Sequence, residues 1–191
     1  MDIPLFPDKS VSEDLTTIYD TSLFIDEFEA YFDQQIIGEI QKATDNKMGA
    51  AAYILISCAI DCLASFWRGR DSTGEIYKEF IDEFFDGYDA NYLYKDLRCK
   101  LVHNYTVGEN LIMCWGEANI HKRHTNEGKI IINLEQFLED FRRAKSLYFA
   151  RLRQDRDLQI KLANRWLEVG ILSPICPDVA QQDTTDNCDD N

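Results

Sequence analysis

The sequence predicts a mainly α-helical domain with one small β insertion. Apolar residues recur every three to four positions through most of the 191-residue chain, as in helices that pack on a core. The composition agrees, because 45% apolar and 28% charged residues are typical of soluble globular proteins. The exception is the stretch at about 109–133, where two short β-prone runs replace the helical spacing. A chain of this length is expected to form one domain with a sizeable core.

Composition divides the chain into three segments. Residues 1–12 are polar and contain two prolines, so we expect a flexible arm. Residues 13–172 carry the apolar periodicity and form the predicted helical domain. Residues 173–191 are acidic and contain no Lys or Arg, which predicts a disordered tail.

The net charge of −14 excludes a general nucleic-acid binder, because affinity for phosphate backbones comes mainly from clustered Lys and Arg. Any contact with RNA must therefore use a local basic patch. The six cysteines show no CxxC pair and no zinc-ligand spacing, and the N-terminal residues show no signal peptide. We therefore expect reduced thiols, no metal, no other cofactor and a cytoplasmic location.

The first expected helix covers about residues 13–42. Its apolar stripe has spacings of three and four residues, and acidic residues occupy the opposite face. The stripe consists of Ile25, Phe28, Phe32, Ile36 and Ile40. This pattern predicts a helix that faces the core and carries no chemistry.

The most apolar segment, residues 49–68, has about the length of a membrane span. An ionised Asp61 near its middle would be costly in lipid, and polar loops flank it closely on both sides. We therefore interpret the segment as a buried core helix and expect no membrane association.

The polar residues of this helix share one face, with spacings of four, four and three. They are Ser57, Asp61, Ser65 and Arg68. A buried carboxylate needs a partner, and Arg98 is the candidate we favour for Asp61. The alternatives are pairing with Arg68 or Arg70, or contact with solvent.

The next helix is expected to begin with a capping box, formed by Ser72 and Glu75 three residues later. Apolar residues then continue at helical spacing to about Gly87.

The segment 94–105 reads YKDLRCKLVHNY and lies near the middle of the chain. Leu93, Leu97 and Leu101 recur every four residues, which predicts a helix with this leucine face toward the core. We expect the helix to fray after Asn104–Tyr105.

Arg98 and His103 are five residues apart in this helix, or roughly 140° around an ideal α-helix. We therefore expect no direct contact between them within one helix. A site that uses both would be a cleft, or a seam between two copies of the helix.

The β-prone runs at 111–115 and 129–132 predict a hairpin at about 109–133, or a three-stranded flap. Between them lie His121 and His124, with a lysine and an arginine in the middle. Two histidines without a carboxylate or thiol at ligand spacing do not define a metal site. We interpret this cluster as an exposed basic tip that could contact RNA.

The last helical region begins at Asn133, with Gln136 as the second half of a capping box. Its apolar stripe loses phase at about 153–157, which predicts a kink or break. Eight Lys and Arg residues mix with acids here, so we expect an ordinary charged face that is also the one broad surface for RNA. They are Arg142, Arg143, Lys145, Arg151, Arg153, Arg156, Lys161 and Arg165.

The pattern Arg98-x4-His103-x-Tyr105 resembles the HEPN domain family, whose mark is an arginine followed four to six residues later by a histidine. This version is similar to that of HEPN ribonuclease toxins encoded beside a minimal nucleotidyltransferase antitoxin. The resemblance implies a HEPN-like antiparallel helical bundle and a homodimer with a composite site. It also implies a metal-independent endoribonuclease, as a toxin or defence component.

The resemblance also implies a division of labour at the site. His103 would transfer protons, Arg98 would bind phosphate and Asn104 would position the substrate. Tyr105 would be the hydroxyl that a partner nucleotidyltransferase adenylylates. Cys99 departs from the pattern, because active members often carry a polar residue after the arginine. We add Asp61 and Ser57 as supporting residues, and Lys95, Lys100 and Arg68 as candidate RNA contacts.

Two other functions remain open on the sequence. One is a non-catalytic HEPN-like module that binds a nucleotide or a protein, and the other is a structural helical adaptor. In the adaptor, Arg98 would only neutralise Asp61 and His103 would cap the helix C-terminus. Tyr105 would be a core residue with its hydroxyl at the edge.

Overall fold

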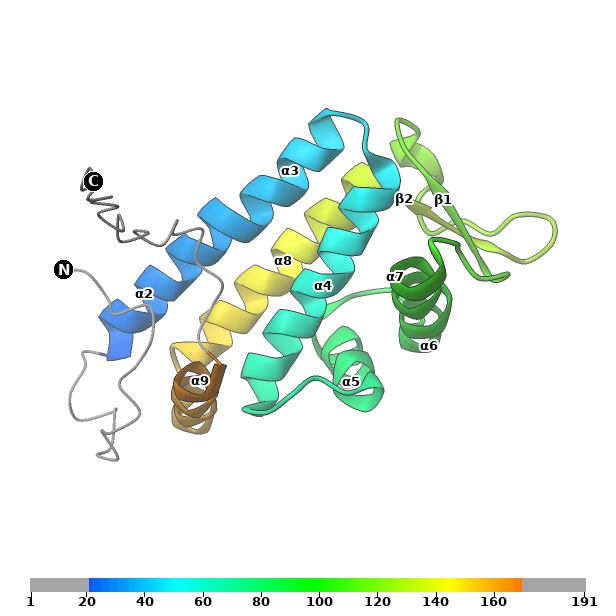
Figure 1. Ribbon diagram of the computed structural model, residues 1–191. Coiled ribbons are helices and arrows are strands. Elements are labelled where there is room, and N and C mark those ends of the chain that lie inside the picture. The colour runs from blue at the N-terminus through cyan, green and yellow to red at the C-terminus, as the bar shows by residue number, and fades with distance from the viewer. Residues whose placement is uncertain (1–20, 170–191) are drawn as a thin grey trace, which may run out of the picture.

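The computed structural model describes residues 21–169 (Figure 1). The expected arm at 1–12 and the expected tail at 173–191 lie outside the described residues. The described part is mainly α-helical, as the sequence predicts, and it contains a small two-stranded sheet. Its first elements are α2 (Thr21–Tyr31), the π-helical turn η1 (Phe32–Ile37), α3 (Gly38–Asp45), α4 (Gly49–Arg68), α5 (Gly74–Phe84) and α6 (Ala90–Tyr92). The remaining elements are the π-helical turn η2 (Leu93–Cys99), α7 (Lys100–Asn104), β1 (Leu111–Cys114), the 3₁₀ turn η3 (Ala118–Ile120), β2 (Ile130–Asn133), α8 (Leu134–Leu152) and α9 (Arg156–Val169).

The helix α4 lies at the centre of this arrangement. Figure 1 shows it beside α3 and α8, with α5 and the α6–α7 segment on its other side. Tyr53, Ile56, Ile60 and Leu63 on α4 are fully buried. The helix is long and apolar enough to cross a membrane, but 56% of its most apolar window is buried inside the fold. This burial supports the predicted core helix.

The first predicted apolar stripe is confirmed, because four of its five residues are almost fully buried. They are Ile25, Phe28, Phe32 and Ile40, while Ile36 is half-buried. α2, η1 and α3 follow one another without a break, and η1 is a wider turn in which backbone bonds run to the fifth residue.

The helix α5 begins after Thr73, whose Oγ1 accepts a hydrogen bond from the Ile76 N–H at 3.3 Å. Ser72 instead donates from Oγ to Asp61 Oδ1 at 2.8 Å. The predicted capping box at Ser72 is therefore wrong. The carboxylate on α4 engages the Ser72 hydroxyl because a charged acceptor makes the stronger bond.

The two strands pair in parallel, with Leu111 opposite Ile130 in the register. The predicted hairpin at about 109–133 is therefore wrong. A hairpin needs a short turn between antiparallel strands, whereas the chain between β1 and β2 is long enough to cross back and run in the same direction. β2 also has an antiparallel neighbour, because His124 pairs with Ile130 across a turn at 125–129.

The helix α8 begins where the sequence predicts, since Asn133 Oδ1 accepts a hydrogen bond from the Gln136 N–H at 3.0 Å. The predicted break also occurs, because α8 ends at Leu152 and α9 begins at Arg156.

Six of the eight basic residues of this region form ion pairs with carboxylates. Lys145 is only 5% exposed, and its Nζ lies 2.9 Å from Glu29 and 2.8 Å from Asp33. Arg153 likewise contacts Asp26 and Glu29 at 2.7 Å. This surface is thus the ordinary charged face. Lys145, Arg151 and Arg153 each join two helices, and most of the positive charge is paired and is not free for RNA.

His121 joins the flap to the helical core. Its Nδ1 accepts a hydrogen bond from the Asn133 N–H at 3.0 Å, so the ring proton sits on Nε2. Nε2 lies 3.3 Å from Asp140 Oδ2 and 2.9 Å from the Tyr88 hydroxyl, which itself donates to Asp140. Burial lowers the pKa of His121 and outweighs the opposing effect of Asp140. Lys122 also contacts Asp140, at 2.7 Å.

The neutral form of His121 should therefore stabilise the fold. Its pKa is lower in the folded protein, so the stabilisation is complete above the ordinary value of about 6.5 and is lost as the pH falls below it. Asp140 stays ionised in that range, because bonds from Lys122 and Tyr88 lower its pKa although burial raises it.

We predict that His121→Ala lowers the free energy of unfolding by about 1–3 kcal/mol near neutral pH, because it leaves a buried N–H without an acceptor. The loss should be smaller at about pH 5, where the unfolded chain binds a proton that the native ring resists. Urea denaturation at both pH values measures this. His124→Ala, an exposed histidine on the same flap, is the control and should change stability by less than about 0.5 kcal/mol. An equal loss for His121→Ala at both pH values would contradict the conclusion that the neutral form of His121 stabilises the fold.

Candidate functional site

The segment with the Arg-His pattern is held against the core by its leucine face. Leu93, Leu97 and Leu101 are each no more than 1% exposed, as the sequence predicts. The opposite face therefore points outward, and it carries Arg98 and His103. α7 ends at Asn104, which is also the predicted end.

Arg98 and His103 contact each other within one chain, with Nη1 and Nε2 3.5 Å apart. The prediction that they would be too far apart around the helix is wrong. It assumed ideal α-helical geometry, whereas Arg98 lies in the π-helical turn η2, where bonding to the fifth residue draws such positions closer to one face. A guanidinium can only donate, so Nε2 is the unprotonated nitrogen of the ring and its lone pair accepts from Arg98. η1 has the same geometry without such residues, so the wide turn alone does not indicate a site.

Asp61 pairs with Arg98, as predicted, with Oδ2 2.8 Å from Nε. Burial alone would lower the pKa of Arg98, but the hydrogen bond that Arg98 donates to Asp61 raises it, so the guanidinium stays charged. Asp61 occupies Nε and leaves the two Nη nitrogens for other acceptors. The alternative partner Arg68 is bound to Glu79 at 2.6 Å instead.

Two residues that the sequence did not single out for the site position this pair. Ser72 donates to the second oxygen of Asp61, and the Arg98 guanidinium lies 5.9 Å from the centre of the Tyr94 ring. Tyr94 fits there only because Gly74 has no side chain, since a Cβ at that position would lie 2.5 Å from the ring. The sequence carried one usable signal, a glycine in the first turn of a predicted helix, which can mark close packing.

The other predicted site residues are not all gathered here. Ser57 is fully buried beside Tyr77, and its Oγ has no hydrogen-bond partner among residues 21–169. Ser57 therefore lies in the core and makes no hydrogen bond to Asp61 or Arg98. Asn104 is exposed at the end of α7, and Tyr105 is 69% exposed. The interpretation of Tyr105 as a core residue is therefore wrong.

The three candidate RNA contacts differ in their surroundings. Lys95 and Lys100 are exposed and belong to the same segment as Arg98. Arg68 is held by Glu79 and lies 3.8 Å above the Trp67 ring, so its charge is already neutralised. Only the two lysines are placed to add positive charge beside the site.

The surroundings of the site differ in charge from the rest of the chain. Residues 90–133 contain six Lys or Arg against four Asp or Glu, together with all three histidines. The segment therefore has a positive balance in a chain whose net charge is −14. Three of the six cations are paired with carboxylates: Arg98 with Asp61, Lys122 with Asp140 and Lys129 with Glu127. The positive balance available to RNA therefore depends on the other three, Lys95, Lys100 and Arg123.

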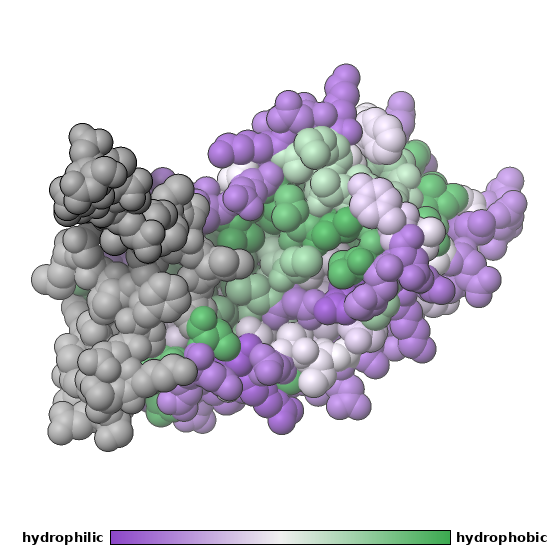
Figure 2. Space-filling model, in the orientation of Figure 1, coloured by the Kyte–Doolittle hydropathy of each residue, from purple (hydrophilic) through white to green (hydrophobic). Residues whose placement is uncertain are grey.

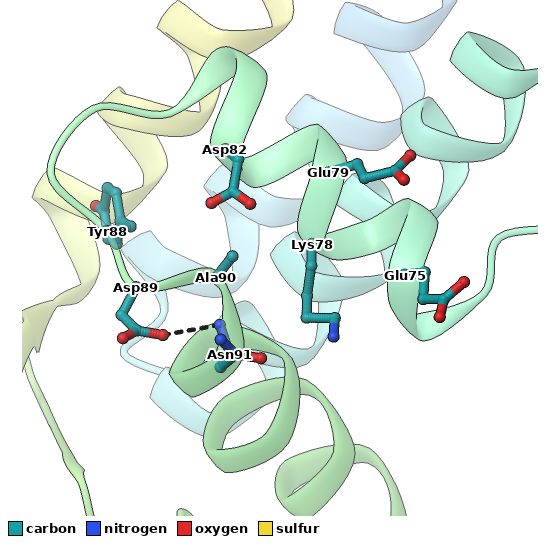
Figure 3. A pocket seen from close by; sticks show the side chains of 8 residues that line it. All are labelled: Glu75, Lys78, Glu79, Asp82, Tyr88, Asp89, Ala90 and Asn91. Carbon is teal, nitrogen blue, oxygen red and sulfur yellow. Dashed lines mark hydrogen bonds between the residues drawn. The ribbon is translucent and has the colours of Figure 1, made fainter.

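A separate open cavity of about 580 Å³ lies between α5 and the start of α6 (Figure 3). Lys78 projects into it among four carboxylates, and neither Arg98 nor His103 lines it. The carboxylates are Glu75, Glu79, Asp82 and Asp89. Such a lining repels phosphate, so the cavity is not an extension of the site.

No cluster of three His, Cys, Asp or Glu side chains that could hold a metal ion occurs within residues 21–169. Comparisons with protein-family models, with curated proteins and with solved structures find no match to the chain. The function must therefore be argued from the site.

We predict that Asp61 and Arg98 are energetically coupled. In a double-mutant cycle with Asp61→Ala and Arg98→Ala, the coupling should be about 1–3 kcal/mol, because the side chains are only 20% and 27% exposed. Urea denaturation of the four proteins measures it.

The control cycle uses Arg68→Ala and Glu79→Ala, a pair that joins α4 to α5 with side chains 35% and 50% exposed. Its coupling should stay below about 1 kcal/mol. Equal coupling in the two cycles would mean that the Asp61–Arg98 pair is an ordinary surface contact.

Proposed function

We propose that this protein is a metal-independent endoribonuclease of HEPN type, a cytoplasmic toxin or defence component. The observation that carries the proposal is the contact between Arg98 and His103, which places a cation and an imidazole together at an accessible surface. The helical fold, the positive balance of residues 90–133 and the Arg-x4-His-x-Tyr pattern add support.

The chemistry follows from what RNA cleavage by its own 2′-OH needs. A base takes the hydroxyl proton as the 2′ oxygen bonds to phosphorus, and an acid protonates the 5′ oxygen as its bond to phosphorus breaks. The products are a 2′,3′-cyclic phosphate and a free 5′-OH. A histidine serves either proton role near neutral pH, and an arginine stabilises the charge on the phosphorane through paired N–H donors.

One chain supplies only one histidine for these two roles. His121 has both ring nitrogens engaged with Asn133 and Asp140, and His124 lies on the flap. A second copy of the chain would bring a second His103 and complete the acid–base pair. The proposal therefore includes a homodimer with a composite cleft.

Helix α4 offers a surface for this dimer beside the Asp61–Arg98 pair. Figure 2 shows apolar surface along the middle of the molecule where α4 faces the viewer. Four α4 residues recur at three- and four-residue spacing, and none of them is fully buried. They form one side of the helix, next to the side that carries Asp61. They are Ala51, Leu55, Cys58 and Cys62. A partly exposed apolar stripe on a core helix fits contact with a second copy.

The exposure of Tyr105 supports the expectation that its hydroxyl is adenylylated by a partner nucleotidyltransferase. A partner nucleotidyltransferase antitoxin could reach it, because the side chain is 69% exposed. A bulky anionic group there, two residues from His103, would block the cleft and repel RNA.

The second candidate function is a non-catalytic HEPN-like module that binds a nucleotide or a protein in the same cleft. One observation favours it: Asp61 already neutralises much of the Arg98 charge. Cys99 in place of the usual polar residue points the same way.

We predict that the purified protein cleaves RNA in the presence of a chelator. His103→Ala should lower the rate about 100-fold or more by removing the proton-transfer group. Arg98→Ala should lower it by a similar factor by removing charge stabilisation. The assay follows a labelled oligoribonucleotide on a gel, with Arg156→Ala, an exposed arginine of α9, as the control that retains full activity. Equal cleavage by the wild type and both site variants would mean contamination and would remove the enzyme from consideration.

We predict that the protein is a dimer in solution and that Leu55→Glu makes it monomeric and inactive. A charge on the α4 stripe would be desolvated without a partner when two copies associate. Light scattering gives the mass, and thermal denaturation shows that the variant is folded. Ala51→Glu is a second variant on the stripe, and Leu147→Glu, on an exposed leucine of α8, is the control. A wild type that is monomeric yet active would exclude the composite cleft.

A further inference from the structure

We propose that the Tyr105 ring is a platform on which an unpaired base of the substrate stacks, so that the site takes single-stranded RNA. The proposal deepens the ribonuclease function above and rests on it. The observations that carry it are the backbone conformation, the exposure and the fixed position of this one residue.

Tyr105 has a left-handed backbone conformation, with φ of 57° and ψ of 32°. This position at a helix end is usually occupied by glycine, because a side chain there costs roughly 1–2 kcal/mol. The ring does not recover that cost by burial, since it is 69% exposed. It also contacts no other aromatic ring within residues 21–169. Every other tyrosine in that range is buried or half-buried.

Lys122, which also has a left-handed backbone conformation, makes contacts that offset the cost of that conformation. Lys122 has φ of 61°, and its Nζ contacts Asp140 and the Asp86 carbonyl, each at 2.7 Å, and lies over the Tyr88 ring. Tyr105 has no comparable set of contacts among the described residues. The left-handed conformation alone does not indicate a site, since the exposed Lys47 after α3 shares it with φ of 58°. Tyr105 differs in that it leaves a large aromatic ring exposed there, and such a departure from local preference is expected at a functional position.

The bend that presents the ring is fixed and does not depend on the ring. The Tyr105 N–H donates to the Leu101 carbonyl at 3.0 Å, which closes the end of α7. Asp96, only 9% exposed, holds the chain that follows: its carbonyl accepts from the Gly108 N–H at 2.8 Å and its Oδ2 from Asn110 at 2.6 Å. A Cβ at Gly108 would lie 2.2 Å from Asp96 Oδ1, so the chain passes close there. Tyr105 is therefore exposed on a rigid turn.

The chemistry beside the ring identifies the ligand. Tyr105 follows His103 by two residues, and the exposed Lys100 lies on the same short helix. A flat exposed ring two residues along the chain from His103, in the segment that carries Arg98, fits a nucleotide whose base is free to stack. A base in a duplex is already stacked between its neighbours. Attack by the 2′-OH in line with the 5′ oxygen also needs a backbone that can rotate, which an A-form duplex restricts.

The test compares the wild type, Tyr105→Phe and Tyr105→Ala on a short oligoribonucleotide, alone and annealed to its complement. Tyr105→Phe keeps the ring and should keep the cleavage rate on the single strand. Tyr105→Ala should raise KM for the single strand about 5- to 100-fold, the equivalent of about 1–3 kcal/mol for one stacked base. All three proteins should cleave the duplex poorly. Trp115→Ala, which removes an exposed ring on the flap, should match the wild type.

A second readout separates this proposal from the ribonuclease function. An uncleavable deoxy-oligonucleotide carrying 2-aminopurine should lose fluorescence on binding to the wild type and Tyr105→Phe, but not to Tyr105→Ala. Quenching without cleavage of RNA would disprove the nuclease and leave the stacking platform standing. Unchanged kinetics and quenching in Tyr105→Ala, equal cleavage of duplex and single strand, or a Tyr105→Ala protein that is monomeric would each overturn the platform.

Discussion

The contact between Asp61 and Arg98 is the constraint on which the site depends. Asp61 lies on the most buried helix of the fold, where a carboxylate is tolerated only if a partner neutralises it. The buried leucines of η2 and α7 hold the segment against the core. The ion pair then fixes its rotation, because it brings Arg98 to Asp61 on α4. Part of the attraction between the two charges is offset by the cost of removing them from water, so the main effect of the pair is to orient the segment.

The neighbours of η2 remove the remaining freedom of the segment. Ser72 holds the second oxygen of Asp61 from the start of α5, and Tyr94 packs where Gly74 leaves room. Asp96 fastens the chain after α7 to the same turn. The position of His103 therefore follows from contacts made by other residues, and a group held in this way needs no reorganisation before it acts.

Periodicity predicted the helices well, because the spacing of apolar residues reports directly which face is buried; the leucine face of 93–101 and the break before Arg156 are examples. The Asp61–Arg98 pair was also predictable, because a buried charge demands a partner. The Arg98–His103 contact was not, because a π-helical turn leaves no mark in residue spacing. The parallel pairing of β1 and β2 was not predictable either. The direction in which the chain between the two strands returns depends on what it packs against, and the β-prone runs themselves do not show this. His121 binds Asp140 and Asn133, and these bonds hold the chain between β1 and β2 in place. The sequence interpretation placed His121 in an exposed basic tip and did not indicate these partners.

Electrostatics gives the exposed ring its importance. A chain with net charge −14 repels RNA that comes within the Debye length of about 10 Å, and the basic residues of α8 and α9 are mostly neutralised by carboxylates. The positive balance of residues 90–133 acts only at short range, so on the proposed function charge alone would hold a strand weakly. Stacking on an aromatic ring is insensitive to that repulsion and adds affinity at the point where the phosphate must be placed. On the proposed function, an exposed tyrosine therefore adds more to RNA affinity in this acidic chain than it would in a basic one.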